Sequence, residues 1–230
     1  MITQRPGTER GHANHGWLDS YHTFSFASYH DPRHMGVSAL RVINDDRIQA
    51  GQGFGAHPHQ HMEIVTYVLD GALEHKDNTG ARAQLRAGEI QVMHAGTGIV
   101  HSEYNASDTD PLHLLQIWLM PNTKQVQPGH SQKSFADKIG ATLIVSPDGR
   151  DGSLRIYQDA CIWQMKLDAQ TSAIEKDLDP KRTYYLHVAS GDLTLNGTAM
   201  TGGDGATLQD ESRLVLKSDA VADALLFDLP

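Results

Sequence analysis

Short apolar segments separated by turn signals recur along almost the whole chain, and this pattern constrains the fold more than any other feature. The segment from Glu63 to Leu69 is mostly β-branched and apolar and ends at Asp70-Gly71, a pair typical of a tight hairpin. From Leu112 to Met120, alternate residues fall on one face, as in a strand. The 21 glycines and 9 prolines supply many turns. The sequence therefore predicts an all-β chain of short strands, arranged as a barrel or a sandwich.

Further strands are expected on both sides of a polar stretch in the middle of the chain. Ser38 to Ile43 is one of them, and the run Asn44-Asp45-Asp46 that follows it is typical of a turn. We therefore expect this strand to end at Ile43. The other expected strands are Ala72 to His75, Glu89 to Met93, Ala141 to Val145, Leu154 to Tyr157, Ile162 to Leu167, Thr183 to Val188, Leu193 to Leu195, Arg213 to Leu216 and Ala224 to Leu229.

The polar stretch also divides the chain, because residues 121–140 lack the strand pattern. We predict an N-terminal barrel over residues 1–125, a linker over 126–140 and a C-terminal barrel over 141–230. The halves are weakly alike, since Tyr67-Val-Leu-Asp-Gly71 and His187-Val-Ala-Ser-Gly191 each precede a strand. A repeat of this length predicts a duplicated barrel rather than a solenoid.

Composition excludes several classes of partner. The net charge of −9 repels phosphate backbones, which disfavours direct nucleic-acid binding. Cys161 is the single cysteine, so no intramolecular disulfide forms, and this fits the reducing cytosol. The first ten residues lack an apolar segment, and no apolar stretch approaches the roughly 20 residues that cross a bilayer. We expect a cytoplasmic protein without membrane contact, and a monomer if the two barrels bury each other's faces.

Two pairs of potential metal ligands have the spacing of neighbouring side chains on one strand face. They are His57-Pro-His59 and His101-Ser-Glu103, and residues at i and i+2 of a strand point the same way. If the two strands face each other across a barrel, the four side chains converge. Imidazole nitrogens with one carboxylate suit Fe, Mn, Co, Ni, Cu or Zn, and they match Ca or Mg poorly. Chance pairing remains the alternative, because the chain contains 14 histidines.

At these residues the chain resembles the cupin superfamily. Gly51, His57, His59, Glu63 and Gly71 follow the first cupin motif with one extra residue before the last glycine. The second motif is less well matched: its Gly98-Ile-Val-His101-Ser-Glu-Tyr-Asn105 tail is present, but its proline is absent and two residues are added upstream. These departures resemble the pirins.

The likeness to pirins is densest over residues 11–120. The segments that carry it are Gly53-Phe-Gly-Ala-His57-Pro-His59, Met93-His-Ala-Gly-Thr-Gly-Ile-Val-His101-Ser-Glu103 and Leu115-Gln-Ile-Trp118. Gly11-His-Ala-Asn-His-Gly-Trp17-Leu-Asp-Ser20 is similar to the start of the bacterial pirin-like quercetin 2,3-dioxygenases.

The resemblance implies a bicupin, two antiparallel β-barrels of the double-stranded β-helix or jelly-roll type, with metal in the N-terminal barrel only. It implies that Glu103 is the carboxylate ligand, whereas Glu63, the ligand position in many other cupins, accepts a hydrogen bond nearby. The positions in the C-terminal half that correspond to His57 and His59 are Asp177 and Asp179. The second barrel is therefore expected to hold no metal.

The remaining histidines are interpreted mainly as structural. His61 lies two residues after His59 and either lines the mouth of the cavity or is solvated, and His94 is also near the site in sequence. Cys161 lacks a nearby basic residue in sequence, so a reactive thiol is not expected. A packed position is expected for His113, core positions for Met62, Met93 and Trp118, and surface or loop positions, because their spacing is irregular, for His12, His15, His22, His30 and His34.

Three functions fit these predictions. The first is a flavonol dioxygenase with one divalent metal, iron before Mn, Co, Ni, Cu or Zn, which binds a small aromatic substrate and O2. In it, Glu103 takes a hydroxyl proton as a general base. The second, also implied by the resemblance, is a redox-sensitive co-regulator that binds a protein partner. The third is a structural zinc site.

Overall fold

The computed structural model describes residues 1–230, and nearly all of its regular structure is β-strand. Contacts divide the chain into an N-terminal unit, made of Gly11–Asp137 and Leu154–Gln158, and a C-terminal unit, made of Met1–Arg10, Lys138–Ser153 and Asp159–Pro230. Two short 3-10 helices, η1 (Gly7–Glu9) and η2 (Arg150–Gly152), are the only helices. Neither is long and apolar enough to span a membrane.

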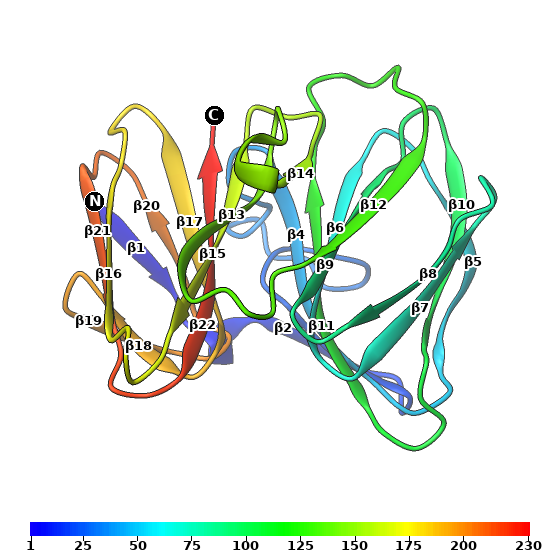
Figure 1. Cartoon of the computed structure of the whole chain (residues 1–230), viewed down its shortest axis with the longest axis horizontal. Helices are drawn as coiled ribbons and strands as arrows, with labels where there is room; N and C mark the ends of the chain where they lie inside the picture. The colour runs from blue at the N-terminus through cyan, green and yellow to red at the C-terminus, as the bar shows by residue number, and fades with distance from the viewer. The chain divides into compact units, whose positions relative to one another are not determined.

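Two antiparallel sheets form the N-terminal unit (Figure 1). The larger has seven strands in the order β12-β9-β6-β11-β4-β3-β2, and the smaller has the order β5-β10-β7-β8. The segment 126–140, predicted to be a linker, contains β12, which pairs with β9. The strands of this unit are β2 (Gly11–Asn14), β3 (Leu18–His22), β4 (Leu40–Ile48), β5 (Gly53–His59), β6 (Glu63–Asp70), β7 (Ala72–Asp77), β8 (Arg82–Arg86), β9 (Glu89–His94), β10 (Ile99–Asn105), β11 (Leu112–Leu119), β12 (Gly129–Ser134) and β14 (Leu154–Arg155).

The C-terminal unit is also a pair of antiparallel sheets. One contains β1-β20-β17-β22-β15-β13 in this order, and the other is β16-β21-β18-β19. The predicted all-β fold of two jelly-roll units is thus confirmed, with each unit built as two sheets rather than one closed barrel. The strands are β1 (Ile2–Arg5), β13 (Gly140–Ser146), β15 (Cys161–Leu167), β16 (Ala173–Asp177), β17 (Thr183–Ser190), β18 (Asp192–Leu195), β19 (Thr198–Thr201), β20 (Gly205–Leu208), β21 (Arg213–Lys217) and β22 (Ala222–Leu229).

The predicted turn at Asn44-Asp45-Asp46 is wrong, because β4 runs through these residues from Leu40 to Ile48. Asn44 and Asp46 lie two residues apart, so both point to one face of the strand, and Asp45 points to the other. All three are buried. A polar run indicates a turn only when its side chains reach water, and here they find polar partners inside the protein instead.

The interiors of the two units differ in kind. In the C-terminal unit, one continuous cluster of aliphatic side chains, including Leu186, Leu214 and Leu226, fills the space between the sheets. In the N-terminal unit, the apolar core is split into a cluster around Leu114 and a second around Ile64. Along β6 and β11, the polar side chains of Thr66, which is buried, and Gln116, which is half-buried, interrupt the apolar inner face between these clusters. This polar layer positions the site described next.

Candidate metal centre

His57, His59 and His101 converge because two adjacent strands present them at matching positions. His57 and His59 share one face of β5, and His101 of β10 lies directly opposite His57 in the antiparallel pair. The expectation that the two strands face each other across a barrel is therefore wrong: they are neighbours in the four-stranded sheet. Pro58 has no N–H for a ladder hydrogen bond, and β5 tolerates it because it is the edge strand.

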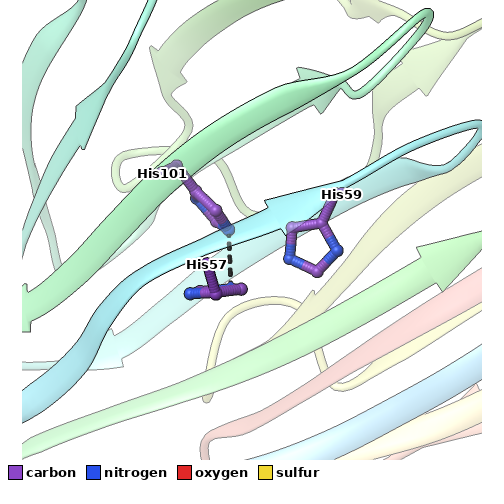
Figure 2. Close-up of side chains that lie close together, drawn as sticks. All are labelled: His57, His59 and His101. Atoms are coloured by element: carbon purple, nitrogen blue, oxygen red, sulfur yellow. Dashed lines mark hydrogen bonds between the residues drawn. The ribbon is translucent and has the colours of Figure 1, made fainter.

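The three imidazole rings form a tight cluster (Figure 2). Their centroids are 4.4 Å apart for His57 and His101, 4.8 Å for His57 and His59, and 4.9 Å for His59 and His101. The Nε2 atoms of His57 and His101 are 3.0 Å apart. His57 Nδ1 lies 2.8 Å from the carbonyl oxygen of Gly55, which only accepts hydrogen bonds, so in the neutral ring Nδ1 carries the proton. The lone pair of His57 is thus on Nε2, which faces His101.

Burial keeps two of these rings in the form that binds a cation. It lowers the pKa of His59 to about 4 and that of His101 to about 3, with the neighbouring histidines adding to the shift. Both imidazoles are therefore neutral at pH 7 and have a lone pair to donate. One ligand atom from each of the three histidines lies within 4.8 Å of the others. The set fits a divalent transition metal, which prefers imidazole nitrogen, better than Ca or Mg.

Glu103 lies beside the cluster, two residues after His101, and a register shift separates these two residues. Its carboxylate accepts hydrogen bonds from Thr66 Oγ1 at 3.3 Å and Gln116 Nε2 at 2.7 Å. Burial raises the pKa of Glu103 to about 7, although both hydrogen bonds favour the charged form. The ligand atoms of Glu103 group with those of His101 and His75, whereas the three-histidine cluster is a separate group that shares His101.

Glu63 has a different environment. Its side chain is buried, and its Oε2 pairs with His94 Nδ1 and accepts the backbone N–H of Tyr157. Glu63 belongs to neither group of potential ligands. Its carboxylate therefore joins β6, β9 and the segment that contains Tyr157. His94 is thereby explained as the partner of Glu63.

His75 is a buried residue of the site that sequence reasoning missed. It lies opposite Glu103 in the register of β7 and β10, and its ring is stacked on that of His130 at 4.8 Å. Both of its nitrogens have neighbours, Asp77 Oδ2 at 3.0 Å and Gln91 Nε2 at 3.4 Å. This makes His75 a packing neighbour of His101 rather than a free donor. The signal was present, because His75-Lys-Asp77 repeats the i, i+2 spacing of the other two pairs.

The cluster opens into a cavity of about 580 Å³. His22, predicted to be a surface or loop residue, is 5% exposed and lines this cavity, because β3 places it on the inner face of the seven-stranded sheet. Trp118, predicted to be in the core, lines it as well. The lining combines aromatic side chains (Trp17, Phe26, Phe54, Trp118), polar side chains (His15, Ser20, His22, Ser28, Asn44, Asp46, Gln116), the candidate ligands His57, His59 and Glu103, and Ala13, Leu18 and Ala27.

Comparisons with known proteins agree with this geometry. A family model described as Pirin matches residues 4–119, and one described as the quercetinase C-terminal cupin domain matches residues 143–229. The chain is 50% identical to a quercetin 2,3-dioxygenase of Escherichia coli K12, over all of this chain and 99% of the relative. It is 44% identical to a putative quercetin 2,3-dioxygenase of Pasteurella multocida, over the full length of both. The bacterial pirin YhhW of Escherichia coli, solved in complex with nickel(II), superposes with a TM-score of 0.95 at 51% identity, covering all of this chain and 99% of that one.

Proposed function

Because the chain belongs to the pirin family of the cupin superfamily, we propose that it is a metal-dependent dioxygenase that cleaves a flavonol with O2. The observation that carries this proposal is the convergence of three histidine nitrogens beside a cavity lined by aromatic side chains, with His57 and His59 on the cavity wall. Relatives that match the full chain are named quercetin 2,3-dioxygenases, and the aromatic lining suits a planar ring system.

We propose that His57, His59, His101 and Glu103 hold the metal. The nickel(II) complex of the related YhhW supports the binding of a divalent ion, and iron is our first candidate for the physiological metal. When bound, such an ion would make a coordinated flavonol hydroxyl more acidic and the flavonol ring more reactive towards O2.

Glu103 is the base in this proposal. Burial raises the pKa of the Glu103 carboxyl group and so strengthens its affinity for a proton, which suits a general base. Thr66 and Gln116 hold the carboxylate in place, since each donates a hydrogen bond to one of its oxygens. In the bound substrate, Glu103 accepts the proton of the flavonol 3-hydroxyl, and that oxygen becomes electron-rich. The walls of the cavity orient the ring and exclude bulk water.

The overall reaction balances without a further reductant. Two C–C bonds of the flavonol heterocycle break, and both oxygen atoms of O2 enter the products, a depside and carbon monoxide. The flavonol is oxidised and O2 is reduced. The proton taken by Glu103 is returned to the depside, so the carboxyl group ends the cycle as it began.

Oxygen uptake by metal-free protein reconstituted in turn with Fe(II), Mn(II), Co(II), Ni(II), Cu(II) and Zn(II) tests this proposal. We expect uptake that depends on quercetin with at least one ion, and its loss in His57→Ala. His12→Ala is the matched control, since His12 is exposed on β2 and pairs with Asp19. If every ion binds stoichiometrically and none supports uptake, the dioxygenase proposal fails, and a co-regulator that binds a protein partner becomes the better explanation.

A further inference from the structure

A row of polar side chains crosses the seven-stranded sheet of the N-terminal unit at one register. Gln91 of β9 is paired with Thr66 of β6, Thr66 with Gln116 of β11, Gln116 with Asn44 of β4, and Asn44 with His22 of β3. Residues paired in this way lie side by side on one face of a sheet. The interior is apolar on both sides of the row, at the clusters around Leu114 and Ile64. The row is thus a polar layer between two apolar clusters.

The residues of this row fall into two parts with different hydrogen-bond partners: Thr66 and Gln116 form the first part, and Asn44 and His22 the second. Thr66 and Gln116 donate to Glu103 and so belong to the candidate metal centre. Asn44 and His22 line the cavity, and His22 Nδ1 lies 2.8 Å from Asn44 Oδ1. Asn44 and His22 have no role in the proposed dioxygenase mechanism.

Asp46 and Ser20 extend the second part by one step. They are paired with each other in the register of β4 and β3, two residues from Asn44 and His22, and both line the cavity. Ser20 Oγ donates to Asp46 Oδ1. Four polar residues therefore form a patch on the inner face of β3 and β4, in the sheet that does not carry the three histidines.

Two groups in this patch have hydrogen-bonding capacity that the protein does not use. Asn44 is 4% exposed, and its oxygen accepts from His22 while its amide nitrogen makes no hydrogen bond within the protein. Asp46 is 3% exposed, and its Oδ1 accepts from Ser20 while its Oδ2 has no partner in the protein. Both residues line the cavity, so a polar ligand there can supply the missing hydrogen-bond partners in place of water.

The hydrogen-bonding groups of the patch limit the kinds of chemical group that a ligand can place there. The Asn44 amide donates, and the Asp46 carboxyl group accepts when ionised and donates when protonated. Burial raises the pKa of Asp46 to about 7, so both forms are present near neutral pH. A hydroxyl group can serve each of them, whereas a carboxylate or phosphate would meet Asp46 and Glu103 in one cavity. The aromatic side chains Trp17 and Phe54 on the same cavity favour a planar ring between the polar groups.

We propose that Asn44 and Asp46 form a subsite that binds hydroxyl groups of a polyhydroxylated aromatic ligand, away from the atoms that react. This inference rests on the proposed function and extends it, because it names the residues that select among flavonols. Quercetin, which has further hydroxyls on both of its aromatic ring systems, should use the subsite. The analogue 3-hydroxyflavone, which retains only the hydroxyl next to the reacting carbons, should not.

Anaerobic binding of the two flavonols to the full chain loaded with Ni(II) tests the subsite. Trp17 and Trp118 line the cavity, so quenching of tryptophan fluorescence reports binding without turnover. We expect Asn44→Leu and Asp46→Leu each to raise the Kd of quercetin about tenfold and the Kd of 3-hydroxyflavone less than about twofold. The matched control is Asp45→Asn on the same strand, because Asp45 points to the opposite face, where it pairs with His113. Its Kd values should stay unchanged, and the Ni(II) affinity of all variants should equal that of the wild type.

If the leucine variants lose affinity for both flavonols equally, or lose none for quercetin, the proposed subsite is wrong. If the leucine variants do not fold, the wild type still decides, because equal affinity for quercetin and 3-hydroxyflavone contradicts the proposal. Oxygen uptake on the same samples separates this proposal from the dioxygenase. Tighter binding of quercetin than of 3-hydroxyflavone, without oxygen uptake, would contradict only the proposed dioxygenase activity. Oxygen uptake with equal affinity for the two flavonols would contradict only the proposed subsite.

Discussion

His101 lies directly opposite His57 across two neighbouring antiparallel strands, and the Nε2 atoms of the two rings are 3.0 Å apart. A lone pair occupies His57 Nε2 when Nδ1 donates to Gly55, so a proton or a cation must lie between the two nitrogens for this contact to be favourable. His59 adds a third nitrogen from the same face. The register of β5 and β10 thus brings the donor set together.

Metal binding should stabilise the folded protein. With free Ni(II) at about a hundred times its Kd, the expected gain of about 2.7 kcal/mol corresponds to a rise in Tm of about 5–10 °C for a chain of this size. His57→Ala should abolish the rise, since it removes one of three clustered donors, and His12→Ala should retain it. Thermal melts with and without Ni(II), followed by circular dichroism, measure the effect. A full rise in His57→Ala would contradict the assignment of this ligand.

Glu103→Gln should separate metal binding from catalysis. Glutamine keeps the shape of the side chain and a carbonyl oxygen, so we expect the Ni(II) Kd to change by less than about tenfold. It cannot take a proton, so flavonol-dependent oxygen uptake should fall at least about a hundredfold. Calorimetric titration with Ni(II) and an oxygen electrode provide the two measurements. Undiminished uptake would rule out Glu103 as the base.

Asp46→Asn should change how stability depends on pH. Burial raises the pKa of Asp46 from 3.8 to about 7, so between these values the folded state binds a proton that the unfolded state has released. The contribution of Asp46 to stability is therefore present at low pH and is lost, by up to about 1.4 kcal/mol per pH unit, as the pH rises through this window. The variant has no such loss, so its stability relative to the wild type should increase by about 1–2 kcal/mol between pH 5 and pH 7.

Urea denaturation at pH 5, 6, 7 and 8 measures this difference. Asn44→Leu is the control, because it alters the same patch without removing a group that titrates, and its difference from the wild type should be the same at each pH. If the free energy of unfolding depends on pH in the same way for Asp46→Asn and the wild type, the carboxyl group titrates normally in the folded protein.

Leu186→Ala should affect stability and leave the metal centre unchanged. Leu186 is fully buried in the continuous apolar cluster of the C-terminal unit, so its truncation leaves a cavity there and should cost about 2–5 kcal/mol. The Ni(II) Kd of the folded variant should stay within about twofold of that of the wild type. Denaturation and calorimetric titration of the same preparation check both statements, and a large loss of Ni(II) affinity would show that the C-terminal unit supports the site.

Strand periodicity predicted much of the fold. The alternation at Leu112, Leu114, Gln116 and Trp118 is present in β11. The hairpin predicted at Asp70-Gly71 is wrong, because β6 and β7 flank Gly71 but belong to different sheets and do not pair with each other. The same periodicity placed His57 beside His59, because residues at i and i+2 share a face whatever the sheet. It could not reveal that β5 and β10 are neighbours rather than opposite strands, since pairing between strands depends on contacts that are distant in sequence.

The sequence pattern gave wrong predictions where polar residues are buried and line the cavity. Asn44-Asp45-Asp46 has the composition of a turn, yet it occupies the middle of β4, where Asn44 and Asp46 face the cavity and Asp45 pairs with His113. His22 was predicted to lie on the surface or in a loop because its spacing from the other histidines is irregular, and it is buried beside Asn44. A local rule assumes that polar side chains seek water, and these side chains meet one another and a cavity instead.

The release of carbon monoxide is the most specific test of flavonol cleavage by the proposed metal centre. Protein loaded with Fe(II) or Ni(II) is supplied with quercetin and O2, and carbon monoxide is measured in the headspace alongside oxygen consumption. We expect one carbon monoxide for each O2 consumed by the wild type and none from His57→Ala. Oxygen consumption without carbon monoxide, or equal release by His57→Ala, would contradict it.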